Sequence, residues 1–198
     1  MTHKKLQYIQ LALEASIPLM GYFLWEWSLY FILLFYFLDL FSSELIMHLK
    51  GRQIFNYNRI AINKKQWAQG GVLSALVLAL SVITIHVTML QIHPEMIFLN
   101  EIVDFWQYEE MGIQQGYLFV PLVLLMSWQQ YKLEFIMPAR YRTTTMKNLW
   151  RPHIISGITV LIGAILSLVT ASLVAINELY FILIIVVVIV LFKLLYKH

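Results

Sequence analysis

The sequence has little charge and no cysteine. Only 13% of its 198 residues are charged, against about 25% in an ordinary soluble domain, so the chain cannot coat a water-facing surface. The lack of cysteine excludes a disulfide-stapled secreted scaffold. A hydrophobic content of 60% excludes a disordered chain and a soluble nucleic-acid-binding protein. These figures indicate an integral membrane protein whose surroundings are the lipid bilayer, and no nucleic-acid partner is expected.

The sequence also lacks the motifs that would indicate an enzyme. The GxSxG nucleophile, the GxGD and HExxH protease signatures, the P-loop and the Rossmann glycines are all missing. No connection between the apolar segments is long enough for a soluble nucleotide-hydrolysing domain. An enzymatic activity is therefore not favoured, and any energy source would be an ion gradient or a partner protein.

Long apolar runs are abundant. A helix needs about 20 mostly apolar residues to cross a bilayer, and six such runs occur, at residues 6–25, 28–48, 72–92, 116–137, 153–176 and 179–196. Ser28 is expected to cap the second helix, and Pro152 is expected in the first turn of the fifth. Pro94 and Pro138 are expected to follow the ends of the third and fourth. The sequence thus predicts an all-α polytopic membrane protein, with one domain of six transmembrane helices in three hairpins.

The charged residues predict the orientation of these helices. With six spans, all 14 Lys and Arg residues fall on the side that holds both termini and the loops 49–71 and 138–152. The loop 93–115 on the other side is acidic. Basic loops mark the cytoplasmic face, so both termini are expected to be cytoplasmic in a bacterial inner (plasma) membrane. A cleaved signal peptide is not expected, because the first run contains Glu14 and is long enough to span.

The acidic outer loop has a helical pattern of its own. Between Met96 and Glu110, polar residues recur at helical spacing, and the opposite side, which includes Leu99, is apolar. This pattern predicts a short helix lying flat on the outer surface, with Trp106 and Tyr108 at the level of the lipid headgroups. Its acids could gather cations, but a solvated acidic face is the favoured interpretation.

Two carboxylates fall deep within the first predicted hairpin. Glu14 and Asp39 both lie about 12 to 14 Å from the inner boundary, at 1.5 Å per residue. If they face each other, at least one is protonated or a cation lies between them. Pro18 also leaves the backbone carbonyl of Glu14 without its helical donor. The pair is a candidate proton or cation site, and the alternative is a shared proton that only locks the hairpin.

A third carboxylate, Glu44, lies closer to the inner boundary. Glu44 and His48 are four residues apart and share one helix face, a spacing that suits joint metal ligation. No further residues complete a recognisable metal motif, so the metal is unknown and a hydrated ion pair with a basic loop residue is favoured. Ser42 and Ser43 are expected to bond back to their helix or across to a neighbour.

The histidines allow a limited test for haem. His48 and His153 both lie near the inner boundary and could meet, but at helix ends where haem would be exposed. His86 lies in the outer half of the third span, and no other spanning histidine matches its depth. A two-haem cytochrome is therefore disfavoured. The cofactor is unknown, and a single haem or metal shared with another subunit stays open.

A ladder of small residues follows the fifth predicted helix. Gly163, Ser167, Ala171 and Ala175 recur at intervals of four residues, which lets another backbone approach closely. The partner backbone could belong to this chain, to a second copy in a homo-oligomer, or to another membrane subunit.

Three functions remain open from the sequence. The first is transport or conduction of a small solute or ion, with Glu14, Asp39 and Glu44 as proton- or cation-binding groups. The second is an accessory or assembly subunit of a larger membrane complex, which could lend His48 or His86 to a cofactor. The third is a membrane-embedded lipid-modifying enzyme, which rests only on Glu44, His48 and Asp39.

Overall fold

The computed structural model describes residue 16 and residues 18–58, 64–110, 113–114, 116–173 and 178–196. Residues 18–24 are helical and precede the labelled helices. The helices are α2 (Leu29–Tyr57), α3 (Lys64–Ile92), α4 (Phe98–Gln107), α5 (Gly116–Tyr131), α6 (Met146–Leu173) and α7 (Glu178–Tyr196). Two short strands, β1 (Glu109–Glu110) and β2 (Ile113–Gln114), pair antiparallel between α4 and α5.

Three of the helices are long and apolar enough to cross a membrane. Among the described residues these are Leu29–Tyr57, Trp67–Ile92 and Met146–Leu173, and α7 contributes a shorter apolar stretch, Glu178–Val188. The predicted all-helical, membrane-type architecture is confirmed at this level. Most of the predicted first span, residues 6–25, lies outside the described residues.

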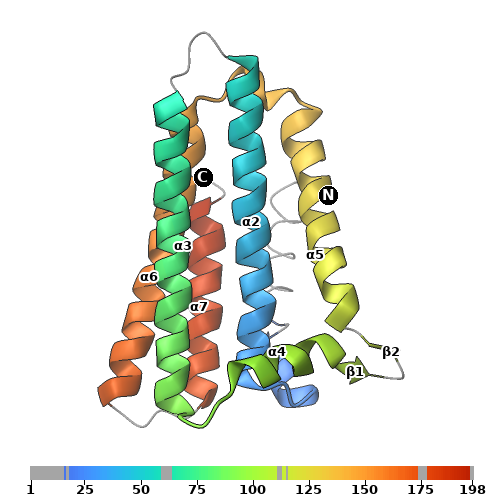
Figure 1. Ribbon diagram of the computed structural model, residues 1–198, viewed down its shortest axis with the longest axis vertical. Coiled ribbons are helices and arrows are strands. Elements are labelled where there is room, and N and C mark those ends of the chain that lie inside the picture. The colour runs from blue at the N-terminus through green and yellow to red at the C-terminus, as the bar shows by residue number, and fades with distance from the viewer. Residues whose placement is uncertain are drawn as a thin grey trace.

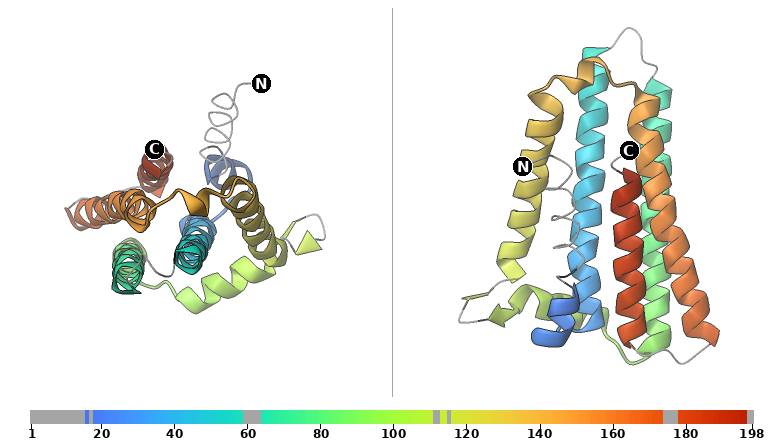
Figure 2. Two further views of the ribbon diagram at one scale, coloured as in Figure 1. Left: turned by 90° about the horizontal axis from the view of Figure 1, so that it is seen from above. Right: turned by 180° about the vertical axis from the view of Figure 1, so that it is seen from behind.

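The long helices run side by side, and α4 lies across one end of them (Figure 1). Helix α2 lies between α5 on one side and α3, α6 and α7 on the other, as the view along the helices shows (Figure 2). Helix α3 packs most extensively on α6, which also packs on α7. The core at the α4 end is formed by the first turns of α2, including Tyr30 and Ile32, together with Phe105 and Ile182.

At the end of the bundle opposite α4, helices α2 and α3 extend well beyond the predicted spans. The segment 49–71 was expected to be a loop, but α2 continues to Tyr57 and α3 already begins at Lys64. The reason is a second core, in which Ile54 of α2 is fully buried among side chains that include Met146 and Trp150. Apolar burial thus keeps the chain helical past the basic residues that suggested a boundary.

Helix α6 begins earlier than the sequence predicts. The expected start was His153, with Pro152 in the first turn, but the helix begins at Met146 and Pro152 lies inside it. The hydroxyl of Thr145 accepts a hydrogen bond from the backbone N–H of Asn148 at 3.2 Å, and this cap starts the helix before the proline. The predicted loop 138–152 is correspondingly shorter.

The fourth predicted span, 116–137, is helical over nearly its whole length, but it is not one uniform α-helix. Helix α5 ends at Tyr131 and continues as a wider π-helical turn, Lys132–Ile136. Ala139 then adopts a left-handed conformation with φ 53°, which turns the chain into a short 3-10 helix, Arg140–Arg142. Pro138 follows Met137, the C-cap of the π-helical turn, and the helix stops there as the sequence predicted.

Two predictions near the α4 end are confirmed. The hydroxyl of Ser28 caps α2 by accepting a hydrogen bond from the N–H of Phe31 at 3.1 Å, and α3 ends at Ile92, two residues before Pro94. The predicted short helix also forms, as α4, but its buried residue is Phe105. Leu99, expected on its apolar side, is 74% exposed.

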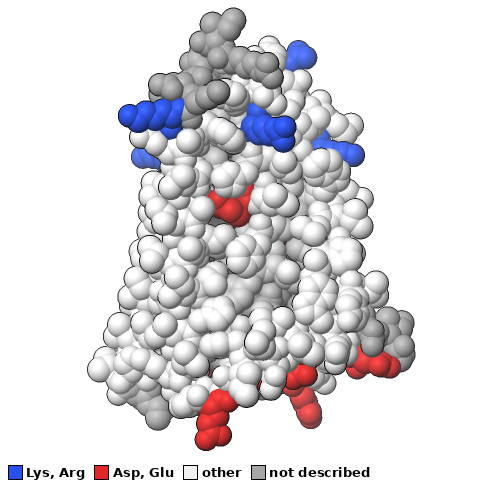
Figure 3. All heavy atoms as spheres, viewed as in Figure 1, with Lys and Arg blue, Asp and Glu red and all other residues white. Residues whose placement is uncertain are grey.

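Charged residues gather at opposite ends of the molecule. Lys and Arg side chains lie at the end where α2 finishes, and Asp and Glu side chains lie at the α4 end (Figure 3). On the face shown, the band between them carries a single acidic patch. Apart from this patch, the long band between the charged ends is uncharged on this face, which matches the apolar middle of the three long helices.

The small-residue ladder of α6 faces α7 of the same chain. A Cβ placed on Gly163 would lie 2.4 Å from a methyl carbon of Val188. Ser167 is buried on the same side, Ala171 is half-buried, and Ala175 lies outside the described residues. The absence of a side chain at Gly163 therefore sets the spacing between α6 and α7.

Gly163→Ala is expected to lower stability by about 1 to 3 kcal/mol through overpacking against Val188, despite the better helix propensity of alanine. Gly157→Ala is the matched control on the same helix, because its Cβ would meet Val77 at a milder 3.1 Å. Thermal unfolding in detergent measures both variants. A Gly163→Ala protein as stable as Gly157→Ala would contradict this packing.

Candidate functional site: a carboxylate held by two histidines and a serine

Glu44 lies at the junction of three helices. Its Oε2 atom accepts hydrogen bonds from Nε2 of His153 in α6 and from the hydroxyl of Ser74 in α3, each at 2.7 Å. Its Oε1 atom accepts one from Nε2 of His48, one turn along α2, at 3.1 Å. We call these four residues the Glu44 cluster. A carboxylate that receives three donors is suited to carry its negative charge away from water.

Glycines in α3 make room for the cluster. A Cβ on Gly71 would lie 2.7 Å from Cε1 of His48, and one on Gly70 would lie 2.5 Å from the indole of Trp150. The backbone of α3 therefore packs directly against the His48 ring and against Trp150 of α6. This close approach brings Ser74, one turn further along α3, within reach of Glu44.

The members of the cluster differ in exposure. The side chain of His153 is 7% exposed and that of Glu44 is 13% exposed, whereas that of His48 is 39% exposed. The buried carboxylate is thus connected to the surface through one histidine and to the interior through the other.

Two further polar groups lie buried beside the cluster. The indole N–H of Trp150 and the hydroxyl of Ser156 have no hydrogen-bond partner among the described residues. Ser156 is fully buried and follows His153 by three residues, on the same face of α6. They are buried polar groups that the described residues leave unpaired close to His153.

The other predicted carboxylates are placed differently. Asp39 lies on α2 at the wall of a cavity among α2, α3, α6 and α7, and Glu14, its predicted partner, lies outside the described residues. Ser42 donates to the backbone carbonyl of Asp39 and also lies 3.0 Å from the hydroxyl of Ser127 in α5. Ser42 therefore bonds both within its helix and across to a neighbour, as the sequence suggested.

His86 belongs to a separate pair near the α4 end. Its Nδ1 donates to the backbone carbonyl of Val82 at 2.8 Å, and its Nε2 lies 2.9 Å from the hydroxyl of Tyr30. The imidazole also stacks on Phe37, with ring centroids 5.4 Å apart. Both ring nitrogens of His86 are thus engaged within the protein, which leaves neither one available as a haem ligand in this conformation.

Metal ligation is not what the cluster geometry offers. Within the described part of the chain no group of three or more His, Asp or Glu side chains is arranged to hold a metal ion. In the cluster, the two histidine nitrogens point at the carboxylate oxygens and bond to them directly. The favoured partner from the sequence, a basic loop residue, is also not the one observed, since His153 and Ser74 take that place.

Ser74 was not predicted as a site residue, although the sequence carries a signal for it. Ser74, Ser81 and Thr88 recur at intervals of seven residues along α3, and all three are buried. A heptad interval keeps side chains on one helix face. The stripe marks the buried face of α3 and could have identified Ser74 as a neighbour of a buried polar group.

A second contact between a histidine and a carboxylate, at the α4 end, was also not predicted. Nε2 of His93 lies 2.8 Å from a carboxylate oxygen of Glu178, the first residue of α7. Ser28 donates nearby to Glu101 of α4 at 3.1 Å. Both interactions tie helix ends together, and the side chains of His93 and Glu178 are 39% and 34% exposed, so we assign them to the packing of this end.

Comparison with known proteins gives no match among protein families, characterised proteins or solved structures.

His153→Leu is expected to destabilise the protein by about 3 to 5 kcal/mol, because it leaves the charge of Glu44 buried without one of its two closest partners. The matched change His48→Leu is expected to cost clearly less, since the His48 side chain is 39% exposed. Chemical unfolding in detergent measures both.

The double variant Glu44→Gln/His153→Leu provides the control. It is expected to be more stable than His153→Leu alone, because removing the charge relieves its burial. Equal losses for the two histidine variants, or no recovery in the double variant, would show that the bonds of Glu44 do not stabilise the bundle.

Proposed function

We propose that this protein is a multi-pass membrane transporter in which the Glu44 cluster takes up and releases protons that are coupled to the movement of a small solute. The observation that carries the proposal is the position of Glu44: a carboxylate 13% exposed, within an apolar helix, that bonds to three other helix positions. Ionisable groups at such positions are costly, and in membrane proteins they commonly mark proton or ion pathways.

The arrangement of the cluster supports a proton path with two ends. His48 is half-exposed and gives Glu44 contact with the surroundings, and His153 leads inward. With Glu44 ionised and both histidines neutral, the cluster carries one negative charge. Uptake of one proton by Glu44 makes the cluster neutral, so this uptake is electrostatically favourable in an apolar setting.

The pattern of hydrogen bonds in the Glu44 cluster argues against the lipid-modifying enzyme. Ser74 donates to Glu44 and not to an imidazole, at 2.7 Å. A serine nucleophile requires a histidine within reach as its general base. The cluster therefore lacks the serine–histidine contact on which a serine hydrolase depends, and it fits proton exchange better.

The accessory-subunit alternative has less to support it. Its main sequence feature was the small-residue ladder, and Gly163 of that ladder is occupied by Val188 of the same chain. The proposed transporter is compatible with a homo-oligomer, but the contact between its copies would not use Gly163. We further propose the orientation that the basic residues indicate, with the end of α2 at Tyr57 and the start of α6 at Met146 on the cytoplasmic side.

Glu44→Gln is expected to abolish proton flux in liposomes that contain the purified protein and a pH-sensitive dye. Glutamine keeps the size of the side chain and removes the group that binds the proton. An imposed pH gradient with valinomycin to clamp the potential gives the flux, and unfolding temperature confirms that the variant is folded.

Glu134→Gln serves as the matched control. Glu134 lies in the π-helical turn, is exposed, and bonds to Gln130 four residues earlier. Its replacement is expected to leave the flux at the wild-type level. Flux in Glu44→Gln liposomes equal to wild type would overturn the proposed function, as would wild-type liposomes no more permeable to protons than empty ones.

A further inference from the structure

A cavity lies deeper in the bundle than the Glu44 cluster, among α2, α3, α6 and α7. Its volume is about 60 Å³. A buried water needs about 10 to 15 Å³ on this measure, so the cavity has room for about four to six non-hydrogen atoms. This is the size of a short organic molecule.

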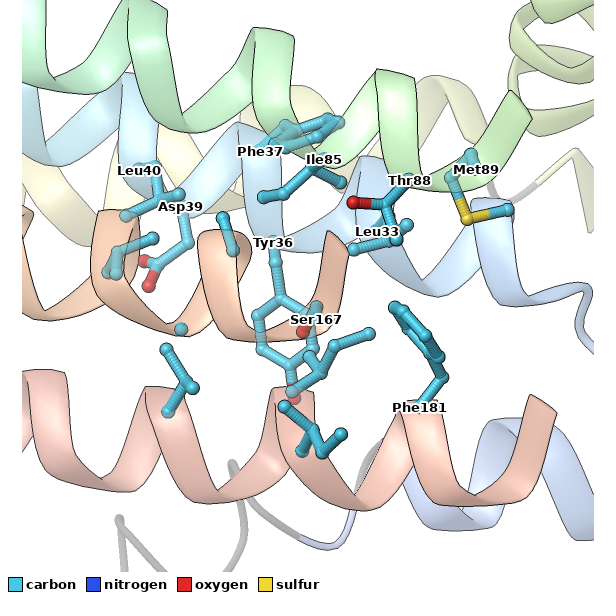
Figure 4. Close-up of a pocket in the computed structure, with 16 residues that line it drawn as sticks. Leu33, Tyr36, Phe37, Asp39, Leu40, Ile85, Thr88, Met89, Ser167 and Phe181 are labelled. Atoms are coloured by element: carbon cyan, nitrogen blue, oxygen red, sulfur yellow. The ribbon is translucent and has the colours of Figure 1, made fainter. Parts of the chain in front are cut away.

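The walls of the cavity are chemically uneven. Of the 16 lining residues, four have polar side-chain atoms: Tyr36, Asp39, Thr88 and Ser167. The close-up shows Asp39 beside Leu40 at one end, with Phe181 and Met89 at the other (Figure 4). Ser167 lies between the two ends. The cavity is thus acidic at one end and apolar along the rest.

This pattern selects a particular chemistry. The carboxylate of Asp39 attracts a positive charge, and the apolar walls are matched by an alkyl chain. From Leu40 to Leu33 the lining residues of α2 cover about 10 Å along the helix, which accommodates an extended chain of a few carbons. A metal cation is poorly matched, because the hard cations common in proteins require six or more oxygen ligands.

The cavity lies next to the cluster along α6. His153, Ser156 and Val160 lie on one buried face of that helix, and Val160 lines the cavity. Along α2, Asp39 and Glu44 are five residues apart, a rise of about 7 to 8 Å. A cation at Asp39 and a proton at Glu44 therefore lie close enough to repel each other within the apolar bundle.

We infer that this cavity binds a short primary alkylammonium ion, with its ammonium group at Asp39 and its alkyl chain directed towards Phe181. The inference rests on the proposed function, because it names the class of solute whose movement the protons of the Glu44 cluster drive. Binding of the cation and protonation of the cluster oppose each other through their like charges, which couples the two as an exchange.

The test uses n-butylammonium, which has five non-hydrogen atoms and matches the volume. Saturation-transfer NMR measures its Kd for the wild-type protein in nanodiscs, with empty nanodiscs subtracted. Asp39→Asn is expected to weaken binding by about tenfold or more. Neutral n-butanol, of the same size, is expected to bind wild type at least about tenfold more weakly than n-butylammonium.

Further variants keep the result independent of folding defects. Ser167→Leu fills the middle of the cavity and is expected to abolish binding, and the exposed control Glu134→Gln is expected to bind as wild type does. The butanol comparison needs no variant at all. Equal affinity for butanol and butylammonium, unchanged affinity in Asp39→Asn, or no binding of butylammonium to wild type would each overturn the inference.

The two proposals fail separately. If n-butylammonium does not bind while wild-type liposomes still carry Glu44-dependent proton flux, the cavity inference is wrong and the proposed function stands. If n-butylammonium binds through Asp39 but Glu44→Gln leaves the proton flux unchanged, the proposed function is wrong and the binding site stands.

Discussion

The structure depends on how one buried carboxylate is compensated. An ionised glutamate in an apolar bundle costs several kcal/mol unless donors surround it. Here the donors come from three helices: His48 from α2, Ser74 from α3 and His153 from α6. Their positions fix the register of these helices against one another. The glycines at 70 and 71 serve the same arrangement, because they let α3 approach His48 and Trp150.

Local features of this fold were predictable, and contacts between distant helices were not. Ser28 correctly predicted the start of α2, and Pro94 predicted the end of α3, because a capping residue or a proline affects the helix only within a few residues of its own position. The end of α2 at Tyr57 was missed, since it depends on Ile54 packing against Trp150, almost one hundred positions away in sequence. Basic residues marked the polar end correctly but suggested a loop where apolar burial maintains helix.

The site shows the same division. The spacing of Glu44 and His48 was visible in the sequence as one helix face, but His153 is 109 residues from Glu44, and only the packing of α6 brings it there. Ser74 carried a signal in the heptad interval it shares with Ser81 and Thr88. The cavity beside Asp39 left no signal, because an internal space is created by side chains from four helices. Asp39 and Glu44 were selected from the sequence, but the cavity beside Asp39 and the partners of Glu44 required the structure; Glu14 lies outside the described residues.

The central claim is that Glu44 changes its protonation state while it remains in the bundle. Infrared difference spectroscopy of the protein in lipid, recorded across a pH titration, measures this directly through the carbonyl stretch of a protonated carboxyl group. The account predicts a pH-dependent carboxyl band that is present in wild type, retained in Glu134→Gln and lost in Glu44→Gln. A band that survives unchanged in Glu44→Gln, or wild-type spectra without such a band, would contradict it.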